Sequence, residues 1–182
     1  MASGASVPQW LNTLVSVVLG FLAGLLNDPV RTYLIGAANR RQMRRALYSD
    51  VLRTFQALVA ISYRMNRDPA KMPYFRESLV RYLRGDLFEY YCHADPGNLY
   101  RLPEFRALEN LYRNFSDLLT MELPAGHDYQ IFVRDLVNIY DYYVRHRKLS
   151  RWTTYRCGGW RLVRHWRDKR PPYSFESIEE LL

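Results

Sequence analysis

Cysteine is scarce in this chain, and its scarcity excludes one class of protein. The 182 residues include two cysteines, Cys92 and Cys157, which lie far apart in the sequence. Two cysteines cannot form the disulfide framework of a small secreted scaffold, although a single bridge between them stays open. We therefore expect most of the chain to lie in a reducing compartment.

Motifs for catalysis and for cofactor binding are also missing. The four histidines and two cysteines show no C-x-x-C or H-x-x-x-H spacing, which argues against a metal site. There is no Walker A motif, no G-x-G-x-x-G and no G-x-S-x-G. The HEPN ribonuclease motif, an Arg followed after four to six residues by His, is absent as well. The sequence therefore predicts a non-enzymatic protein that has no catalytic residue, metal or cofactor.

The N-terminal segment lacks charge. Residues 1–27 contain no charged side chain, and most residues from Trp10 to Leu26 are large and apolar. At about 1.5 Å per helical residue this stretch reaches roughly 25 Å, close to the roughly 30 Å of a bilayer core. Trp10 at one end and Tyr33 beyond the other match the usual places of interfacial aromatic residues. We expect a single transmembrane helix here.

Two other interpretations of the apolar stretch stay open. A cleaved signal peptide needs a basic region before the stretch, and the first nine residues supply only the amino terminus. A buried core helix of a soluble protein fits a short apolar run that contains Asn12, Thr13 and Ser16. We favour the membrane anchor.

Basic residues follow the apolar stretch, and none precedes it. By the positive-inside rule, this asymmetry places the N-terminus outside and residues 31–182 in the cytosol. The prediction is a single-pass protein of the cell inner membrane that contacts membrane lipid. The arginines expected to set this topology and to contact headgroups are Arg31, Arg40, Arg41, Arg44 and Arg45.

Small and polar residues recur at every fourth position of the apolar stretch. They are Asn12, Ser16, Gly20 and Gly24, and the two glycines form a G-x-x-x-G. On a helix they form one stripe, where small residues let two membrane helices approach closely and Asn or Ser can hydrogen-bond across the contact. The pattern predicts a self-associating anchor and a homo-oligomer. The alternative is a lone helix that tolerates its glycines.

The chain is expected to divide into four segments. Asn27-Asp28-Pro29 predicts a helix break or a new helix start, with Asp28 as N-cap and Pro29 at the first helical position. The expected segments are an N-terminal tail and transmembrane helix at 1–27, a basic juxtamembrane helix at 28–45, a helical bundle at 46–147, and a basic-aromatic C-terminal segment with an acidic tail at 148–182.

The sequence of the expected cytosolic part predicts an all-α fold. Apolar residues recur at three- and four-residue spacings in four stretches, and no comparable stretch alternates apolar and polar residues. Short connections containing Pro or Gly favour an antiparallel four-helix-like bundle. The residues expected on the four apolar stripes are Leu47, Val51, Leu58, Ile61 and Met65, then Phe75, Leu79, Leu83, Leu87 and Tyr90, then Phe105, Leu108, Tyr112, Phe115 and Leu119, and finally Phe132, Leu136, Ile139 and Tyr143.

Cations and aromatic rings are interleaved after the bundle, where residues 146–170 contain nine basic residues and one acid, Asp168. Such a strip can lie on anionic headgroups, or it can bind the bases and phosphates of a nucleic acid through residues 151–170. Its rings can also cover the open end of the bundle. We favour the membrane surface. The residues of this basic-aromatic surface are Trp152, Arg156, Trp160, Arg161, Arg164, Trp166 and Arg167.

The stretch GFLAGLLNDPVRTYL, residues 20–34, and the order of segments around it resemble small membrane-anchored helical effector proteins of bacterial phage-defence systems, of the retron-associated type. The resemblance implies a candidate membrane-perturbing effector. Its cytosolic bundle would sense a signal or bind a partner, either a cytosolic protein or a nucleic acid. The resemblance transfers no functional residue to this chain.

Overall fold

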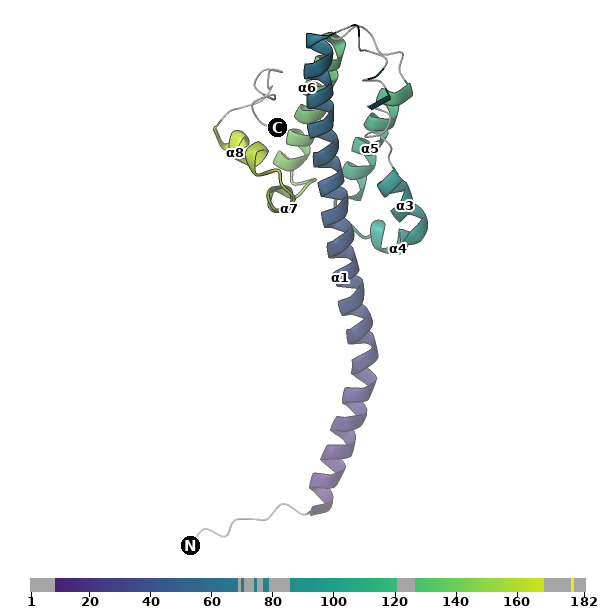
Figure 1. Ribbon diagram of the computed structural model, residues 1–182. Helices are drawn as coiled ribbons and strands as arrows, with labels where there is room; N and C mark the ends of the chain where they lie inside the picture. The colour runs from purple at the N-terminus through teal and green to yellow at the C-terminus, as the bar shows by residue number, and fades with distance from the viewer. Residues whose placement is uncertain are drawn as a thin grey trace. The chain divides into compact units, whose positions relative to one another are not determined.

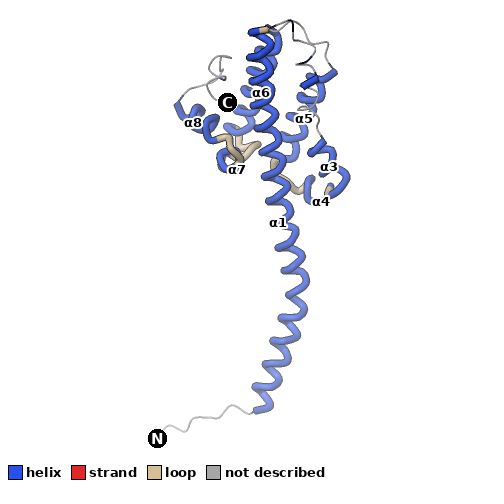
Figure 2. Tube along the Cα trace, in the orientation of Figure 1, coloured by secondary structure: helices blue, strands red, loops and turns tan. Residues whose placement is uncertain are grey.

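The computed structural model describes residues 9–68, 70, 74, 77–78, 86–120, 127–168 and 178. Helices dominate this part of the chain, which contains no strand (Figures 1 and 2). The all-α prediction is confirmed for these residues. The helices are α1 (Gln9–Arg67), α3 (Asp86–Ala94), α4 (Pro96–Leu99), α5 (Phe105–Thr120), α6 (His127–Arg145), α7 (Arg151–Arg156) and α8 (Trp160–Asp168).

The chain forms two compact units, Met1–Asn39 and Arg40–Leu182. In the first unit the described residues belong to the N-terminal part of α1. In the second unit the remainder of α1 packs with α5 and α6, and the shorter helices α3, α4, α7 and α8 complete it. The acidic residues of the predicted C-terminal tail lie outside the described residues.

The predicted helix break at residues 27–29 is wrong. Pro29 lies inside α1, which is continuous for 59 residues and crosses the expected segment boundaries after residues 27 and 45. A proline inside a helix removes one backbone hydrogen bond, here the one that would reach the carbonyl of Leu25. Helical residues continue on both sides of Pro29, and a helix of this length is not ended by the loss of one bond.

Among the described residues, the long helices α1, α5 and α6 form most of the core of the second unit. Leu47, Val51 and Phe55 of α1 are almost fully buried, and their four-residue spacing puts them on one face. The ring of Phe55 makes edge-to-face contacts with Phe115 of α5 and Tyr140 of α6, with both centroid distances 5.6 Å. Each such ring pair contributes roughly 0.5–1.5 kcal/mol beyond the burial of its apolar area. These contacts hold α5 and α6 alongside α1 (Figure 1).

Most predicted core residues of α1 and α5 are buried, whereas the stripe expected on α6 is displaced. The buried face of α6 centres on Val133, Val137 and Tyr140. Val133 and Tyr140 each come one residue after a predicted residue that is only half-buried, Phe132 and Ile139 respectively. The predicted residues that are buried are Leu47, Val51, Leu58, Ile61, Leu108, Tyr112, Phe115 and Leu136. Those that are half-buried are Leu87, Phe105, Phe132, Ile139 and Tyr143, and Tyr90 is exposed. Phe75, Leu79 and Leu83 and the side chains of Met65 and Leu119 lie outside the described residues.

Two glycines connect α7 to α8. Gly158 has a φ of 100°, in the left-handed region that favours glycine. Gly159 is buried, and a β-carbon on it would lie 2.7 Å from Cγ2 of Thr154 and 3.2 Å from Cδ1 of Leu52. Only a glycine at position 159 lets this connection approach both α7 and α1 so closely.

We expect Gly159→Ala to destabilise the chain by about 1–3 kcal/mol, because the added methyl group forces well-packed neighbours apart. Denaturant unfolding of the full-length chain in detergent, followed by tryptophan fluorescence, measures the loss. Gly97→Ala is the matched control, since a β-carbon on Gly97 of α4 meets no atom within 4 Å. Equal unfolding midpoints for the two variants would contradict the close packing at Gly159.

Candidate functional site

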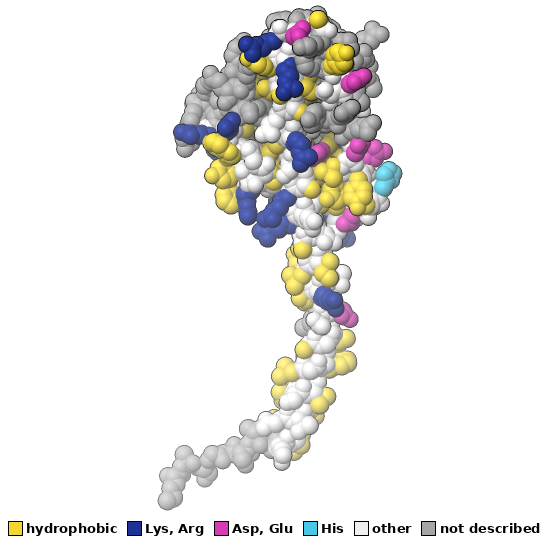
Figure 3. Space-filling view, in the orientation of Figure 1, with side chains coloured by type: hydrophobic (Ala, Val, Ile, Leu, Met, Phe, Trp, Pro, Cys, Tyr) yellow, Lys and Arg dark blue, Asp and Glu magenta, His cyan; other side chains and the backbone are white. Residues whose placement is uncertain are grey.

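Apolar side chains are exposed along the helical segment of the first unit (Figure 3). Phe21, for example, is 67% exposed. Within the described residues, α1 is the one helix long and apolar enough to cross a membrane, and none of its apolar window is buried. Contiguous exposed apolar surface of this kind marks an interaction with lipid or with another protein.

The four residues of the predicted helix-packing stripe lie on this exposed part of α1. Asn12, Ser16, Gly20 and Gly24 are all exposed. A β-carbon built on Gly20 or Gly24 meets no atom within 4 Å. The stripe is therefore open to a second molecule along its whole length.

The five predicted topology arginines fall into two groups. Arg31, Arg41 and Arg45 are exposed. Arg40 instead donates to Oδ1 of Asn98 at 3.0 Å, and Arg44 forms an ion pair with Glu104. Two of the five thus make polar contacts within the second unit.

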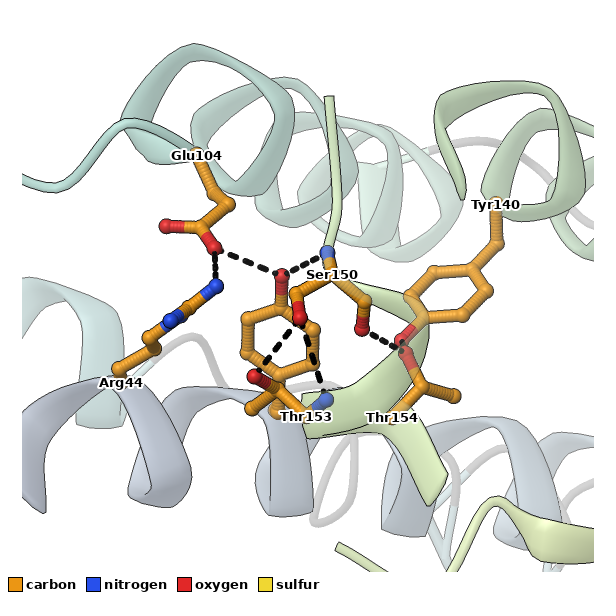
Figure 4. A network of polar contacts seen from close by, with 7 residues as sticks. Arg44, Glu104, Tyr140, Ser150, Thr153 and Thr154 are labelled. Carbon is orange, nitrogen blue, oxygen red and sulfur yellow. Dashed lines mark hydrogen bonds and ion pairs between the residues drawn. The ribbon is translucent and has the colours of Figure 1, made fainter. Parts of the chain in front are cut away.

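A buried carboxylate links three parts of the second unit. Glu104, which is 4% exposed and directly precedes α5, accepts hydrogen bonds at Oε1 from Arg44 and, at 3.3 Å, from the Tyr48 hydroxyl. The Tyr48 oxygen in turn accepts the backbone N–H of Ser150 at 2.6 Å. Glu104 and Tyr48 thereby connect α1 to the start of α5 and to the start of α7. Figure 4 shows Arg44, Glu104 and Ser150 in this network.

Ser150 extends this polar network into α7. Its hydroxyl caps the helix by accepting the Thr153 N–H at 3.2 Å, and its carbonyl accepts the Thr154 hydroxyl at 3.0 Å. Because that bond uses the one hydroxyl proton of Thr154, the Tyr140 hydroxyl donates to Thr154 Oγ1, at 2.7 Å. A serine N-cap contributes about 1 kcal/mol. The network thus fixes α7 to both α1 and α6.

Burial raises the pKa of the tyrosines around this network. Burial and then the charge of Glu104 raise the pKa of Tyr48, and burial raises the pKa of Tyr140. Tyr112 donates to Oδ2 of Asp50 at 2.6 Å, and burial followed by the Asp50 charge raises its pKa well above the ordinary range. All three phenols therefore stay neutral and keep donating their hydrogen bonds at physiological pH.

The helices α7 and α8 carry exposed aromatic rings beside arginines. Trp152 is 66% and Trp160 46% exposed, so both rings present surface to solvent. The guanidinium carbon of Arg156 lies 5.7 Å from the Trp152 ring centre, and that of Arg161 lies 5.3 Å from the Trp160 ring centre. Cations over ring faces are attracted by the ring quadrupole. The predicted basic-aromatic surface is therefore exposed at these four residues.

A pocket of about 450 Å³ opens on this surface. Arg151 and Arg164 line it together with the rings of Tyr155 and Trp160. Two cations beside two rings suit a phosphate attached to a larger body, such as a lipid headgroup or a nucleotide. The side chains of Trp166 and Arg167 lie outside the described residues.

Within the part of the chain that the structure describes, no three or more His, Cys, Asp or Glu side chains are grouped to hold a metal ion. Cys92 and Cys157 are both free thiols, so the bridge left open by the sequence is not formed. Burial, followed by the charges of Glu109 and Glu89, raises the pKa of the Cys92 thiol. The Cys92 thiol is therefore a poor nucleophile at neutral pH.

Sequence patterns missed the Glu104 network. Arg44 and Glu104 are 60 positions apart, and nothing near either residue in the sequence indicates the pairing. Glu104 follows Pro103 and has the pattern of an ordinary acidic residue at the start of a helix. The one available signal is Ser150, a good N-cap residue directly before the basic-aromatic stretch.

Stability should fall steeply above about pH 10. Because the folded pKa values of Tyr48, Tyr112 and Tyr140 exceed the value of about 10 for unfolded tyrosine, the folded state keeps protons that the unfolded state releases. The contribution of these phenols to the free energy of unfolding is fully present below about pH 10. Above that pH it falls by up to roughly 1.4 kcal/mol per pH unit for each phenol. Denaturant titrations across this range measure the slope.

Tyr140→Phe should make this alkaline slope shallower, because it removes one of the phenols that hold a proton. Tyr100→Phe, which changes an exposed ring, is the control and should keep the wild-type slope. If Tyr140→Phe also kept the wild-type slope, burial of this phenol would not be the cause of the alkaline loss.

No protein-family model, curated protein or solved structure matches this chain. The resemblance of residues 20–34 to phage-defence effectors stays a prediction. The function therefore has to be inferred from two surfaces of the chain itself, the exposed apolar part of α1 and the basic-aromatic surface of α7 and α8.

Proposed function

We propose that the protein is a non-enzymatic, single-pass protein of the cell inner membrane, anchored by residues 10–26. The observation that carries this proposal is the exposed apolar surface of α1, none of which is buried in its most apolar window. Leaving apolar surface in water costs about 25 cal/mol for each Å², and a bilayer removes that cost. A core helix of a soluble protein would instead be buried by the remainder of its own chain.

The proposed orientation has the N-terminus outside and the unit from Arg40 onward in the cytosol. It is supported by the absence of basic residues before the apolar stretch and by the exposed Arg31, Arg41 and Arg45 after it. We assign headgroup contact to these three exposed arginines.

The basic-aromatic surface is proposed to bind anionic headgroups of the same membrane. Its exposed rings and arginines have the chemistry of an interfacial contact, in which Trp lies at the headgroup level and Arg binds lipid phosphate. A membrane-tethered nucleic-acid-binding module is the second candidate, because Trp152 and Tyr155 present parallel rings 6.1 Å apart that suit base stacking. We favour lipid, since the apolar stretch already points to a membrane.

Self-association of the anchor and an effector role complete the proposal. The stripe from Asn12 to Gly24 is open, which is what close helix pairing requires. Clustered anchors would perturb the membrane during phage defence, once the cytosolic unit senses a signal or binds a partner. We further propose that this unit is an antiparallel four-helix-like bundle.

Carbonate extraction of bacterial membranes tests the anchor. The full-length chain should stay in the membrane pellet. Val18→Arg should release it to the soluble or aggregated fraction, because a charge at the centre of a spanning helix costs about 2.5–3.5 kcal/mol. Val30→Arg, next to Arg31 at the proposed cytosolic end, is the matched control and should stay in the pellet. Release of the wild-type chain by carbonate would refute the proposal.

Gly24→Leu should abolish growth arrest on overproduction while protein level and membrane fraction stay unchanged, because the larger side chain keeps paired helices apart. Since a β-carbon at Gly24 meets no atom within 4 Å, the substitution should not disturb the single chain. Ala23→Leu adds bulk to a different face of the helix and should remain toxic. Equal toxicity of Gly24→Leu and wild type would show that clustering through this stripe is wrong.

A further inference from the structure

A second arginine-lined pocket lies where α6 ends and α7 begins. Its volume is about 410 Å³, and its polar lining includes Asp141, Arg145, Arg147, Ser150 and Arg151. Three arginines against one aspartate make the lining strongly positive. None of these residues belongs to the exposed apolar part of α1.

The aspartate in this pocket already forms an ion pair with one of the arginines. Asp141 is buried, and its Oδ2 accepts a hydrogen bond from Nε of Arg145 at 2.6 Å. Arg147 and Arg151 are exposed, and among the described residues neither forms an ion pair or a side-chain hydrogen bond. The pocket therefore presents two cations that no carboxylate within the described part of the chain neutralises.

The backbone of Arg147 is held in a conformation that glycine normally adopts. Its φ is 57°, in the left-handed region. The N–H of Lys148 donates to the carbonyl of Tyr143 at 2.7 Å, and the N–H of Arg147 donates to that of Val144 at 3.1 Å. These two bonds form the Schellman motif that ends α6, whose left-handed residue is usually glycine. An arginine here costs stability, and such strain is a mark of functional positions.

We propose that this pocket binds a phosphate group carried on a larger polar molecule, with Arg147 and Arg151 as its ligands. Guanidinium groups donate paired hydrogen bonds to phosphate oxygens, and two arginines that line one pocket match the charge of a phosphate better than a single lysine would. The pocket is larger than one phosphate, so the bound group has a body attached. This site does not depend on the membrane anchor. Either a lipid headgroup or a soluble phosphorylated molecule has the required chemistry.

The first test is thermal unfolding of the full-length chain in detergent with inorganic phosphate and pyrophosphate. Both ions should raise the melting temperature of the wild type. Arg147→Gly should melt about 2–4 °C higher than wild type without added ion, because the backbone strain is relieved. It should bind the ions at least about tenfold more weakly, because the charged donor is gone. Asparagine also tolerates the left-handed region, so Arg147→Asn should fold normally. It should lose the response to the ions as well.

Lys148→Gln is the matched control. It removes one positive charge from the adjacent residue, which does not line the pocket, so it should keep the wild-type response. Nonspecific screening of the net charge would instead weaken the response equally in Lys148→Gln and Arg147→Gly, and that result would overturn the proposal.

A second experiment distinguishes a lipid headgroup from a soluble molecule as the source of the phosphate. The full-length chain is placed in nanodiscs of phosphatidylcholine, with or without phosphatidylglycerol. A stabilisation by phosphatidylglycerol that requires Arg147 assigns the site to a headgroup, and one by the soluble ions in detergent assigns it to a soluble molecule. The absence of any response that depends on Arg147, to all three probes, overturns the proposal. Because the detergent arm involves no bilayer, its outcome is independent of the proposed anchor.

Discussion

The carboxylate of Glu104 imposes the constraint on which the folded unit depends. A carboxylate that is 4% exposed has lost its water, and an unpaired buried charge costs several kcal/mol. Its Oε1 must therefore be met by donors, which are the Arg44 guanidinium and the Tyr48 hydroxyl. Both donors lie on α1 one turn apart, so the pairing sets the start of α5 against one face of that helix. Removing the Arg44 guanidinium would leave this buried carboxylate without its cation, which makes the contact a strong determinant of the arrangement.

The same carboxylate controls the basic-aromatic surface indirectly. Tyr48 donates to Glu104 and accepts the Ser150 N–H, and Ser150 caps α7. The rings and arginines of α7 are thus presented by a helix whose N-cap residue, Ser150, is fixed by a buried network. Arg151, the first residue of α7, lines both basic pockets. A surface that recognises phosphate needs its donors preorganised, and a capped, anchored helix supplies that.

The net charge of +8 has different roles along the chain. Arg44 and Arg145 are paired with buried acids, and Arg40 bonds to an amide, so these cations stabilise the fold. Other arginines are exposed, among them those that follow the apolar stretch and those of α7 and α8. The exposed cations, and not the total, are therefore what a membrane or another phosphate-bearing partner would meet. The proposed membrane partner would meet both these arginines and the apolar part of α1.

The sequence alone determined the helical class, the apolar stretch and most of the core of α1 and α5, because helical periodicity and local composition are carried by neighbouring residues. It indicated the exposed arginines and tryptophans of α7 and α8 only as a pattern. Tertiary structure decided the rest. The helix α1 continues through Pro29, since one lost backbone bond does not end a long helix, and packing turned the buried face of α6 by one residue. Tertiary structure also paired Arg44 with Glu104 across 60 positions and placed Arg147 in a glycine-like conformation, because contacts between distant segments are not encoded in any local pattern.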